Sequence, residues 1–219
     1  MGLTLYHCHN ARSFRALWGL EELGLTYELV MLPFPPRVHA RDYLKINPLG
    51  TIPYFIDGET RMTESAAIAE YLAAKYGGGR LAVAQDEPAF GAYLNGLHYG
   101  EATLTFPQTL VLRYTRLEPE ERRQPQVASD YAKWFLGRLR ALQTILETAD
   151  YVAANRFTAA DISVAYALLL AGSLDIPLPD WVAPYWDRMQ ARDGYRRAQA
   201  AQKAAAEAQG FRTAPLSTL

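Results

Sequence analysis

The sequence predicts a mixed α/β domain with a four-stranded sheet, followed by a second domain built of helices alone. Two observations lead to this fold class. Over the first part of the chain, short runs with strand character alternate with runs of helical period, whereas the remainder shows helical periods only. The stretches GGGR and QDEP lie between the two parts. The 219 residues have room for two modest domains. We expect these domains at residues 1–80 and 88–219, with a linker at residues 81–87.

The first domain follows from its strand and turn signals. We expect strands at residues 3–7, 26–32, 53–56 and 61–63, helices at residues 11–23 and 65–76, and a weakly helical stretch at residues 39–46. Gly24 ends the first helix. The opening strand, helix and strand predict a parallel pair with a right-handed crossover. The Asp57–Gly58 turn predicts an antiparallel hairpin at the edge of the sheet.

The second domain shows only helical patterns. They begin near residue 88 and run over residues 126–148, 159–172 and 181–192, with an alanine-rich, low-complexity tail at residues 198–208. Pro107 should kink or break the first of these helices. Thr158 and Asp161 have the spacing of a capping box, so we interpret Asp161 as a structural residue at a helix start.

Composition excludes several classes of partner. The formal net charge is −1, which argues against nucleic acid binding, because neutralising phosphates needs an excess of Lys and Arg. The longest apolar run is too short to span a membrane, and no signal peptide is visible. Cys8 is the single cysteine, so no internal disulfide can form and we expect a cytoplasmic protein.

Two short motifs suggest a site for a zwitterionic peptide. Ile52 precedes Pro53, and a cis peptide bond there would turn the Ile52 N–H and C=O outward to pair with an extended ligand. A trans proline at the start of an edge strand is the alternative. Glu64 and Ser65 lie at a helix start, where a carboxylate can hold an ammonium group and the helix N-terminus can hold a carboxylate. A basic side chain from the loop before the third strand, such as His39, Arg41 or Lys45, could meet a distal carboxylate. These are the requirements of a site for a γ-glutamyl tripeptide.

The chain resembles the cytosolic glutathione S-transferase superfamily along nearly its whole length. The resemblance rests on LTLYH followed by ARSFRALWGLEELGLTYEL, then NPLGTIPYFIDGETRMTES, AIAEYL and FTAADISVAYAL, in that order. It implies a thioredoxin-like N-terminal domain, an all-helical C-terminal domain, a homodimer and glutathione as co-substrate. It also implies that the glutathione-binding residues are Arg12, His39, Thr51, Ile52, Pro53, Glu64 and Ser65.

The resemblance further implies that the protein forms a glutathione thiolate. A free thiol has a pKa of about 8.5, so few molecules are ionised at neutral pH. The family places Tyr, Ser or Cys at the end of the first strand or the start of the first helix. This sequence departs from that pattern and has Asn10 or Ala11 there. Asn10, whose NH₂ group can donate to a sulfur anion, and Ser13 are our catalytic candidates. Tyr6, Cys8 and the backbone alone remain open as alternatives.

Metal binding is not expected. His7 and His9 should face one way along an extended strand and Cys8 the other, so the three cannot converge.

Substrates of this family bind against the first two helices of the helical domain. The electrophile-site candidates here are Tyr99, Phe106, Arg113 and Tyr114, with Arg113 able to stabilise developing negative charge. The predicted function is conjugation of the glutathione thiolate to hydrophobic electrophilic small molecules, a detoxification reaction. The alternatives are a glutathione-dependent peroxidase, disulfide reductase or isomerase, and a non-catalytic binding module.

Overall fold

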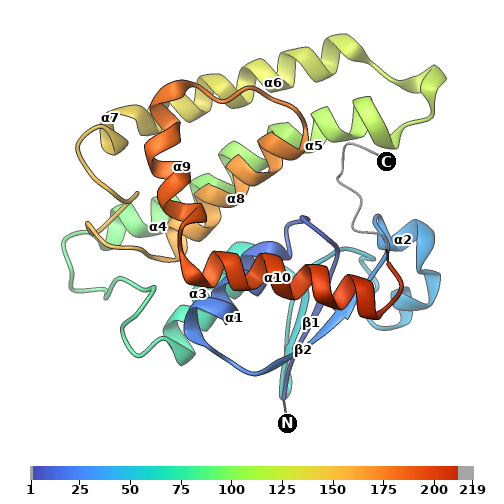
Figure 1. Ribbon diagram of the computed structural model, residues 1–219, viewed down its shortest axis with the longest axis horizontal. Helices are drawn as coiled ribbons and strands as arrows, with labels where there is room; N and C mark the ends of the chain where they lie inside the picture. Colours follow the sequence, from blue (N-terminus) through green and yellow to red (C-terminus); the bar gives the residue numbers. More distant parts are fainter. Residues whose placement is uncertain (1, 212–219) are drawn as a thin grey trace. The chain divides into compact units, whose positions relative to one another are not determined.

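A computed structural model describes residues 2–211, which form two compact units (Figure 1). The first unit contains residues 2–80 and 191–211, and the second contains residues 81–190. The first domain was expected from the sequence at residues 1–80 and the second at residues 88–219. Residues 191–211 were expected in the second domain, but here they join the first unit. Residues 212–219 of the expected second domain lie outside the described residues.

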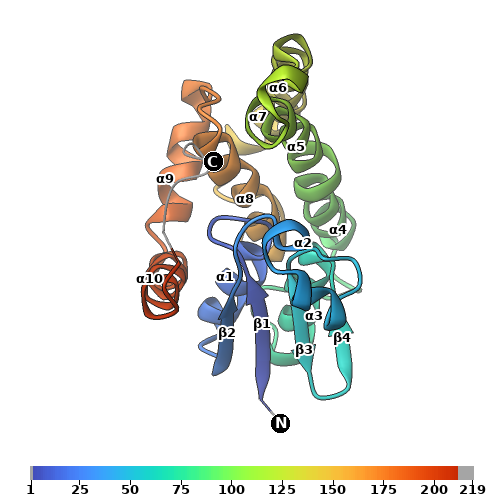
Figure 2. The same ribbon diagram turned by 90° about the vertical axis from the view of Figure 1, so that its right-hand side faces the viewer.

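The first unit is built around a four-stranded mixed sheet. Its strands are β1 (Leu3–His7), β2 (Tyr27–Met31), β3 (Tyr54–Asp57) and β4 (Thr60–Met62), in the order β2-β1-β3-β4, which Figure 2 shows from one side. β1 is parallel to β2 and antiparallel to β3, and β3 and β4 form the expected hairpin. The predicted parallel pair and antiparallel edge are therefore confirmed.

Two helices pack together against one face of this sheet (Figure 2). They are α1 (Phe14–Leu23) and α3 (Ser65–Tyr76). Gly24 ends α1 with a φ of 67°, the left-handed conformation that glycine adopts without steric cost. The short helix α2 (Pro36–His39) and a 3₁₀ turn at Arg41–Lys45 fill the connection between β2 and β3. This connection carries several of the predicted site residues.

Helix α10 (Asp193–Ala208) was not predicted, because its sequence was interpreted as a low-complexity tail. It packs against α1 and β2, and it is the red helix in Figure 1. Alanine has the highest helix propensity and lets a helix approach its neighbour closely. The ring of Tyr195 lies 5.5 Å from that of Phe14 and 5.0 Å from that of Trp18, both edge-on. Aromatic packing thus holds the start of this alanine-rich helix on the first unit.

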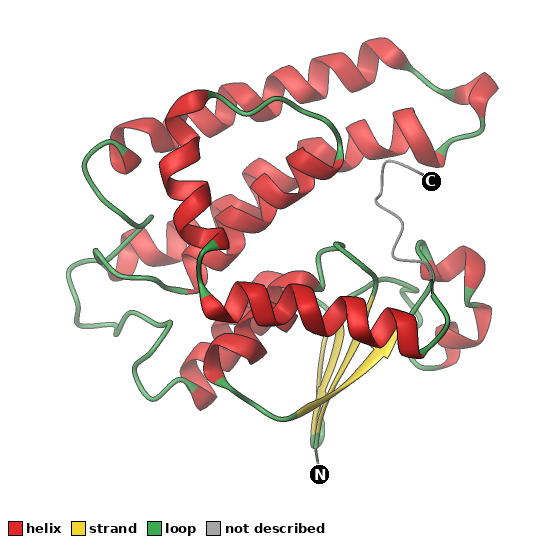
Figure 3. Cartoon of the chain, in the orientation of Figure 1, coloured by secondary structure: helices red, strands yellow, loops and turns green. Residues whose placement is uncertain are grey.

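The second unit contains helices and no strand among its described residues (Figure 3). Its α-helices are α4 (Phe90–His98), α5 (Phe106–Leu112), α6 (Pro125–Leu139), α7 (Gln143–Leu146), α8 (Ala159–Ser173) and α9 (Ala183–Gln190). The all-helical prediction is confirmed. Within residues 2–211, no helix combines the length and apolar character needed to cross a membrane.

Pro107 does not break the helix that contains it. A π-helical stretch, Tyr99–Thr105, continues α4, and α5 follows it directly with Pro107 as its second residue. A second π-helical stretch, Arg113–Leu117, extends α5. Proline lacks the N–H that an α-helix interior requires. The helix therefore changes its hydrogen-bonding pattern beside the proline and continues.

Residues 81–87, expected as a linker, are bonded to the second unit. The backbone N–H of Ala159 donates to the Leu81 carbonyl at 2.8 Å. Glu87 accepts from the Ala84 N–H at 2.7 Å and pairs with Arg156 at 2.7 Å. The segment is thus fixed to the helix that begins at Ala159.

Candidate functional site

Three segments of the first unit meet at the carboxyl end of β1. Cys8 and Ala11, which follow β1, pack in one buried cluster with Tyr43 and Ile52. The start of α1 reaches the start of α3, where Arg15 Nη1 donates to Ser65 Oγ at 3.0 Å. The fold therefore brings together the loop after β1, the segment before β3 and the N-terminus of α3.

Side chains hold the segment before β3 in place through hydrogen bonds to its backbone. The Ile52–Pro53 peptide bond is cis. The Thr51 carbonyl accepts hydrogen bonds from Tyr43 Oη at 2.8 Å and Asn47 Nδ2 at 2.9 Å. Gly50 has a φ of 61°, and a Cβ there would lie 2.8 Å from the Leu44 side chain. No described residue takes up the Ile52 N–H or C=O, so this backbone can pair with an extended ligand.

The start of α3 combines an exposed carboxylate with a polarised hydroxyl. Glu64 is the exposed N-cap residue, and Ser65 is the first residue of the helix. The Ser65 oxygen accepts from Arg15, so its own proton is available to donate to an anion. Arg15 is fully buried directly behind it and adds positive charge to the helix N-terminus. No local signal in the sequence links Arg15 to Ser65, because the two residues are 50 positions apart.

A hydrogen-bond network surrounds Asn10. Its φ of 53° lies in the left-handed region, which asparagine tolerates better than most residues. The Asn10 N–H donates to Gln202 Oε1 at 3.0 Å, and Gln202 Nε2 donates to Asn10 Oδ1 at 2.7 Å. Gln202 comes from α10, the helix that the sequence analysis did not predict. No local signal in the sequence links these two residues.

Ser13 faces the interior of the first unit. It is fully buried, its Oγ lies 2.7 Å from His7 Nδ1, and the same oxygen accepts from the Cys8 N–H at 3.3 Å. The hydroxyl is therefore engaged by β1 and the loop after it.

The remaining alternatives for thiol activation are also engaged within the domain. Burial raises the pKa of the Cys8 thiol well above its usual range, which keeps it protonated. The Tyr6 ring packs 5.4 Å from that of Tyr43 and 6.0 Å from that of Tyr54. The Ala11 N–H already donates to the Cys8 carbonyl at 3.1 Å.

The other predicted ligands lie nearer the surface. Arg12 is half-buried in the loop between β1 and α1. His39 is exposed at the end of α2, and Thr51 is exposed beside Ile52. Pro53 is buried next to β3. Thr51, Ile52 and Pro53 lie together at the end of the connection between β2 and β3, whereas His39 lies nearer its start, at the end of α2.

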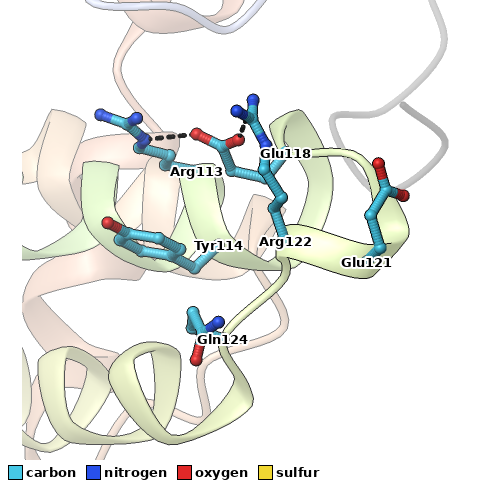
Figure 4. A pocket seen from close by; sticks show the side chains of 6 residues that line it. All are labelled: Arg113, Tyr114, Glu118, Glu121, Arg122 and Gln124. Atoms are coloured by element: carbon cyan, nitrogen blue, oxygen red, sulfur yellow. Dashed lines mark hydrogen bonds and ion pairs between the residues drawn. The ribbon is translucent and has the colours of Figure 1, made fainter.

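The electrophile-site candidates lie in the second unit. Tyr99 Oη donates to the Arg138 carbonyl, and Phe106 is 53% exposed. Arg113 and Tyr114 line a surface hollow of about 400 Å³ at the end of the helix that contains α5 (Figure 4). Arg113 Nε donates to Glu118 at 2.8 Å and its guanidinium lies 5.6 Å from the centre of the Tyr114 ring.

Most of the charged side chains that line this hollow form ion pairs with one another. Arg113 and Arg122 both point toward the Glu118 carboxylate in Figure 4, and both form ion pairs with it. These ion pairs lower the pKa of Glu118. Among residues 2–211, no group of three His, Cys, Asp or Glu side chains could hold a metal ion.

The fold and this site define a two-part protein with a thioredoxin-like domain, an all-helical part, and a helix start at Ser65 that is bonded to the buried Arg15. Residues 1–74 match the family model described as glutathione S-transferase, N-terminal domain. Glutathione S-transferase GstB of Escherichia coli (strain K12) is 30% identical over 81% of this chain and 88% of its own length. The chain belongs to the glutathione S-transferases, a family of enzymes.

Two further comparisons support this membership. Glutathione S-transferase 3 of Schizosaccharomyces pombe is 37% identical, over 47% of this chain and 42% of its own length. The chain thus spans less than half of that relative. The glutathione transferase URE2P6 from Phanerochaete chrysosporium, solved in complex with oxidized glutathione, has a TM-score of 0.77 and 26% identity. That comparison covers 93% of this chain and 97% of the other.

Proposed function

We propose that this protein is a glutathione transferase that joins the glutathione thiolate to hydrophobic, electrophilic small molecules. The observation that carries the proposal is the place of Asn10. It lies in the loop between β1 and α1, its side-chain oxygen accepts from Gln202, and its neighbour Ala11 belongs to the same buried cluster as Ile52. A fixed NH₂ donor at the end of the first strand suits the stabilisation of a sulfur anion.

The peptide part of glutathione has a matching set of groups. The Ser65 hydroxyl and the N-terminus of α3 would bind the α-carboxylate of the γ-glutamyl group, with Arg15 supporting them from behind. Glu64 would bind the ammonium group. The Ile52 backbone, beside Thr51 and Pro53, would pair with the peptide, and Arg12 and His39 are the basic side chains proposed for the far carboxylate.

Asn10 is the best-placed activating residue. Ser13 directs its hydroxyl to His7, and Cys8 is buried and protonated. An amide cannot remove the thiol proton, but it stabilises the thiolate once the proton leaves to solvent. Lowering a thiol pKa by about two units stabilises the anion by about 2.7 kcal/mol, within reach of a helix N-terminus and one donor.

The test is a pH titration of the ultraviolet absorbance of bound glutathione thiolate. In the wild-type protein we expect a midpoint well below that of free glutathione. Asn10→Ala should raise this midpoint by about one pH unit, because one donor to the anion is lost. Asn10→Gly is the matched control for the backbone, since glycine adopts the positive φ without strain. The proposed role requires both variants to show the same rise.

Equal midpoints in the wild-type protein and both variants would contradict the role of Asn10. A wild-type protein that does not bind glutathione would instead favour the non-catalytic binding module.

Disulfide reduction by glutathione is a second candidate. The oxidized glutathione in the URE2P6 structure favours it, whereas a conjugate, 1-(S-glutathionyl)-2,4-dinitrobenzene, was cocrystallized with Ure2p5 of the same organism. Because Cys8 is buried, the attacking thiol would have to come from glutathione itself. Rates with 2-hydroxyethyl disulfide and with 1-chloro-2,4-dinitrobenzene separate the two candidates. Cys8→Ser should leave both rates unchanged.

We also propose a homodimer and a cytoplasmic role in detoxification. The single, buried Cys8 suits a reducing compartment. For the electrophile we propose the second-unit residues Tyr99, Phe106, Arg113 and Tyr114. Phe106 is the most exposed apolar member of this set.

A further inference from the structure

We propose that Gln202, on helix α10, is a positioning residue that turns the NH₂ group of Asn10 toward the sulfur of bound glutathione. The inference rests on the proposed function, in which Asn10 donates to that sulfur. Gln202 is fully buried and lies 192 positions from Asn10 in the sequence. It would act through Asn10 and would not touch the substrate.

Gln202 forms two hydrogen bonds with Asn10. Its Oε1 accepts from the Asn10 backbone N–H at 3.0 Å, and its Nε2 donates to Asn10 Oδ1 at 2.7 Å. The second Nε2 hydrogen is directed to Gln199 Oε1 at 2.6 Å. Both donors and the acceptor oxygen of the Gln202 amide are therefore used, and rotation of the amide would break several hydrogen bonds at once.

The orientation of the Asn10 side-chain amide follows from its backbone N–H, which can act only as a hydrogen-bond donor. A backbone N–H can only donate, so the Gln202 atom that faces it must be the oxygen. The Gln202 nitrogen then faces the Asn10 side chain. Because that nitrogen can only donate, Asn10 must present its oxygen to Gln202. The Asn10 Nδ2 group consequently lies on the side of the amide away from Gln202.

A hydrogen bond with His7 also fixes the orientation of the Gln202 amide. Its Nε2 lies 3.0 Å from Gln202 Oε1, so Nε2 carries the ring proton and donates it. The other ring nitrogen, Nδ1, then accepts from the Ser13 hydroxyl at 2.7 Å. Ser13 Oγ in turn accepts from the Cys8 N–H at 3.3 Å, a second obligatory donor. Backbone N–H groups thus anchor the network at both ends, and the buried ring stays neutral.

Helix α10 therefore contributes to the function of the site, through Gln202, as well as to the packing of the first unit. An asparagine with a freely rotating amide would present oxygen or nitrogen to a thiolate, and only the nitrogen stabilises the anion. A single fixed orientation removes the unfavourable arrangement before the substrate binds, which is the advantage of preorganised donors.

The test compares Gln202→Met with Gln209→Met by thiolate titration of bound glutathione. Gln202→Met keeps the length of the side chain but removes the amide, and we expect the midpoint to rise by about one pH unit, tenfold in the ionisation constant. Gln209 also joins the end of α10 to the sheet, through Leu29 and Met31, but does not contact Asn10. Gln209→Met should leave the midpoint unchanged.

Two measurements separate positioning from general damage. Affinity for S-methylglutathione, which has no thiol proton, should be the same in Gln202→Met and in the wild-type protein. In an Asn10→Ala background, Gln202→Met should add no further shift, because the two residues act through one donor. If Gln202→Met does not fold, Gln202→Glu replaces it: a carboxylate still accepts from Asn10 N–H but cannot donate to Oδ1, and the same rise is expected.

The outcomes distinguish this inference from the proposed function. A midpoint raised by Asn10→Ala but unmoved by folded Gln202→Met overturns the positioning role and leaves the proposed function standing. A midpoint unmoved by Asn10→Ala overturns both the role of Asn10 and that of Gln202. Absence of glutathione binding to the wild-type protein overturns the proposed function and this inference with it.

Discussion

At the residue scale, His7 shows how burial selects a protonation state. The side chain is fully buried at the end of β1, and this burial lowers its pKa from 6.5 to about 3. His9, also positively charged when protonated, adds to the lowering. The hydrogen bond that His7 donates to Gln202 Oε1 opposes the lowering of the pKa but does not outweigh the loss of water. The folded protein therefore contains a neutral imidazole at any pH in which proteins are normally handled.

This burial predicts acid sensitivity. The unfolded chain binds a proton at His7 near pH 6.5 and the folded chain does not, so the contribution to stability is present above that pH and is lost as pH falls toward 3. Between pH 7 and pH 5 the loss should be about 2 kcal/mol. Urea unfolding of the wild-type protein and of His7→Gln at both pH values measures it. The advantage of the wild-type protein over the variant should shrink by that amount at pH 5, and an unchanged difference would contradict the prediction.

At the element scale, the start of α8 bears out the capping box predicted from the sequence. Thr158 Oγ1 accepts from the Ala160 N–H, and Asp161 Oδ2 accepts from the Thr158 N–H at 2.9 Å. The other Asp161 oxygen accepts from the Val152 N–H at 2.9 Å and from Tyr185 Oη at 3.1 Å. One carboxylate thus joins the helix start to the preceding loop and to α9. The structural interpretation of Asp161 stands on these bonds.

Asp161→Asn should destabilise the second unit. Asparagine has one oxygen and one NH₂ group, so at least one of the donors that Asp161 now satisfies would face another donor in a buried place. A cost of about 1–3 kcal/mol is expected, measured by thermal or urea unfolding at neutral pH. Burial raises the pKa of Asp161 to about 6, so the carboxylate is ionised under these conditions.

Asp130→Asn is the matched control for this substitution. Asp130 is exposed on α6, and among residues 2–211 its carboxylate accepts from Gln126 alone, at 2.8 Å, so its replacement should change stability by less than about 0.5 kcal/mol. Equal changes in the free energy of unfolding for the two substitutions would show that the hydrogen bonds of the Asp161 carboxylate do not add to stability.

At the scale of the whole molecule, the connection between β2 and β3 exposes an apolar surface. Val38, Leu44, Ile46 and Leu49 are between 37% and 62% exposed in this short segment of the first unit. Clustered exposed apolar side chains favour a protein contact. The homodimer proposed for this family member would cover such a surface.

Light scattering coupled to size-exclusion chromatography tests the dimer. We expect a mass of twice the 24.5 kDa chain. Leu49→Asp should shift the population toward single chains, because a buried charge without a partner would oppose association. Ile145→Asp, at an exposed apolar position on α7, is the control and should keep the dimer. A single-chain mass for the wild-type protein at all concentrations would contradict the proposal.

The sequence by itself determined most of the helices and strands, though not helix α10, and it singled out the local motifs of the proposed site. Strand and helix periods, Gly24, the Asp57–Gly58 turn and the Thr158–Asp161 cap depend on contacts within a few residues, and such contacts can be inferred from local spacing. The motif at Ile52 and the Glu64–Ser65 helix start are equally local. This is why the order of the first domain and the all-helical character of the second agree with the structure.

Only the tertiary structure decided what surrounds Asn10. The alanine-rich segment became helix α10, and its Gln202 reaches Asn10 across 192 positions of sequence. Ser13 turned inward to His7, and Arg15 was buried behind Ser65. The physical reason is that a polar side chain in a closed interior must find its hydrogen-bond partners there, whatever their distance along the chain. The local pattern of the sequence does not indicate those partners. The orientation of the Asn10 amide therefore depends on the folded domain alone.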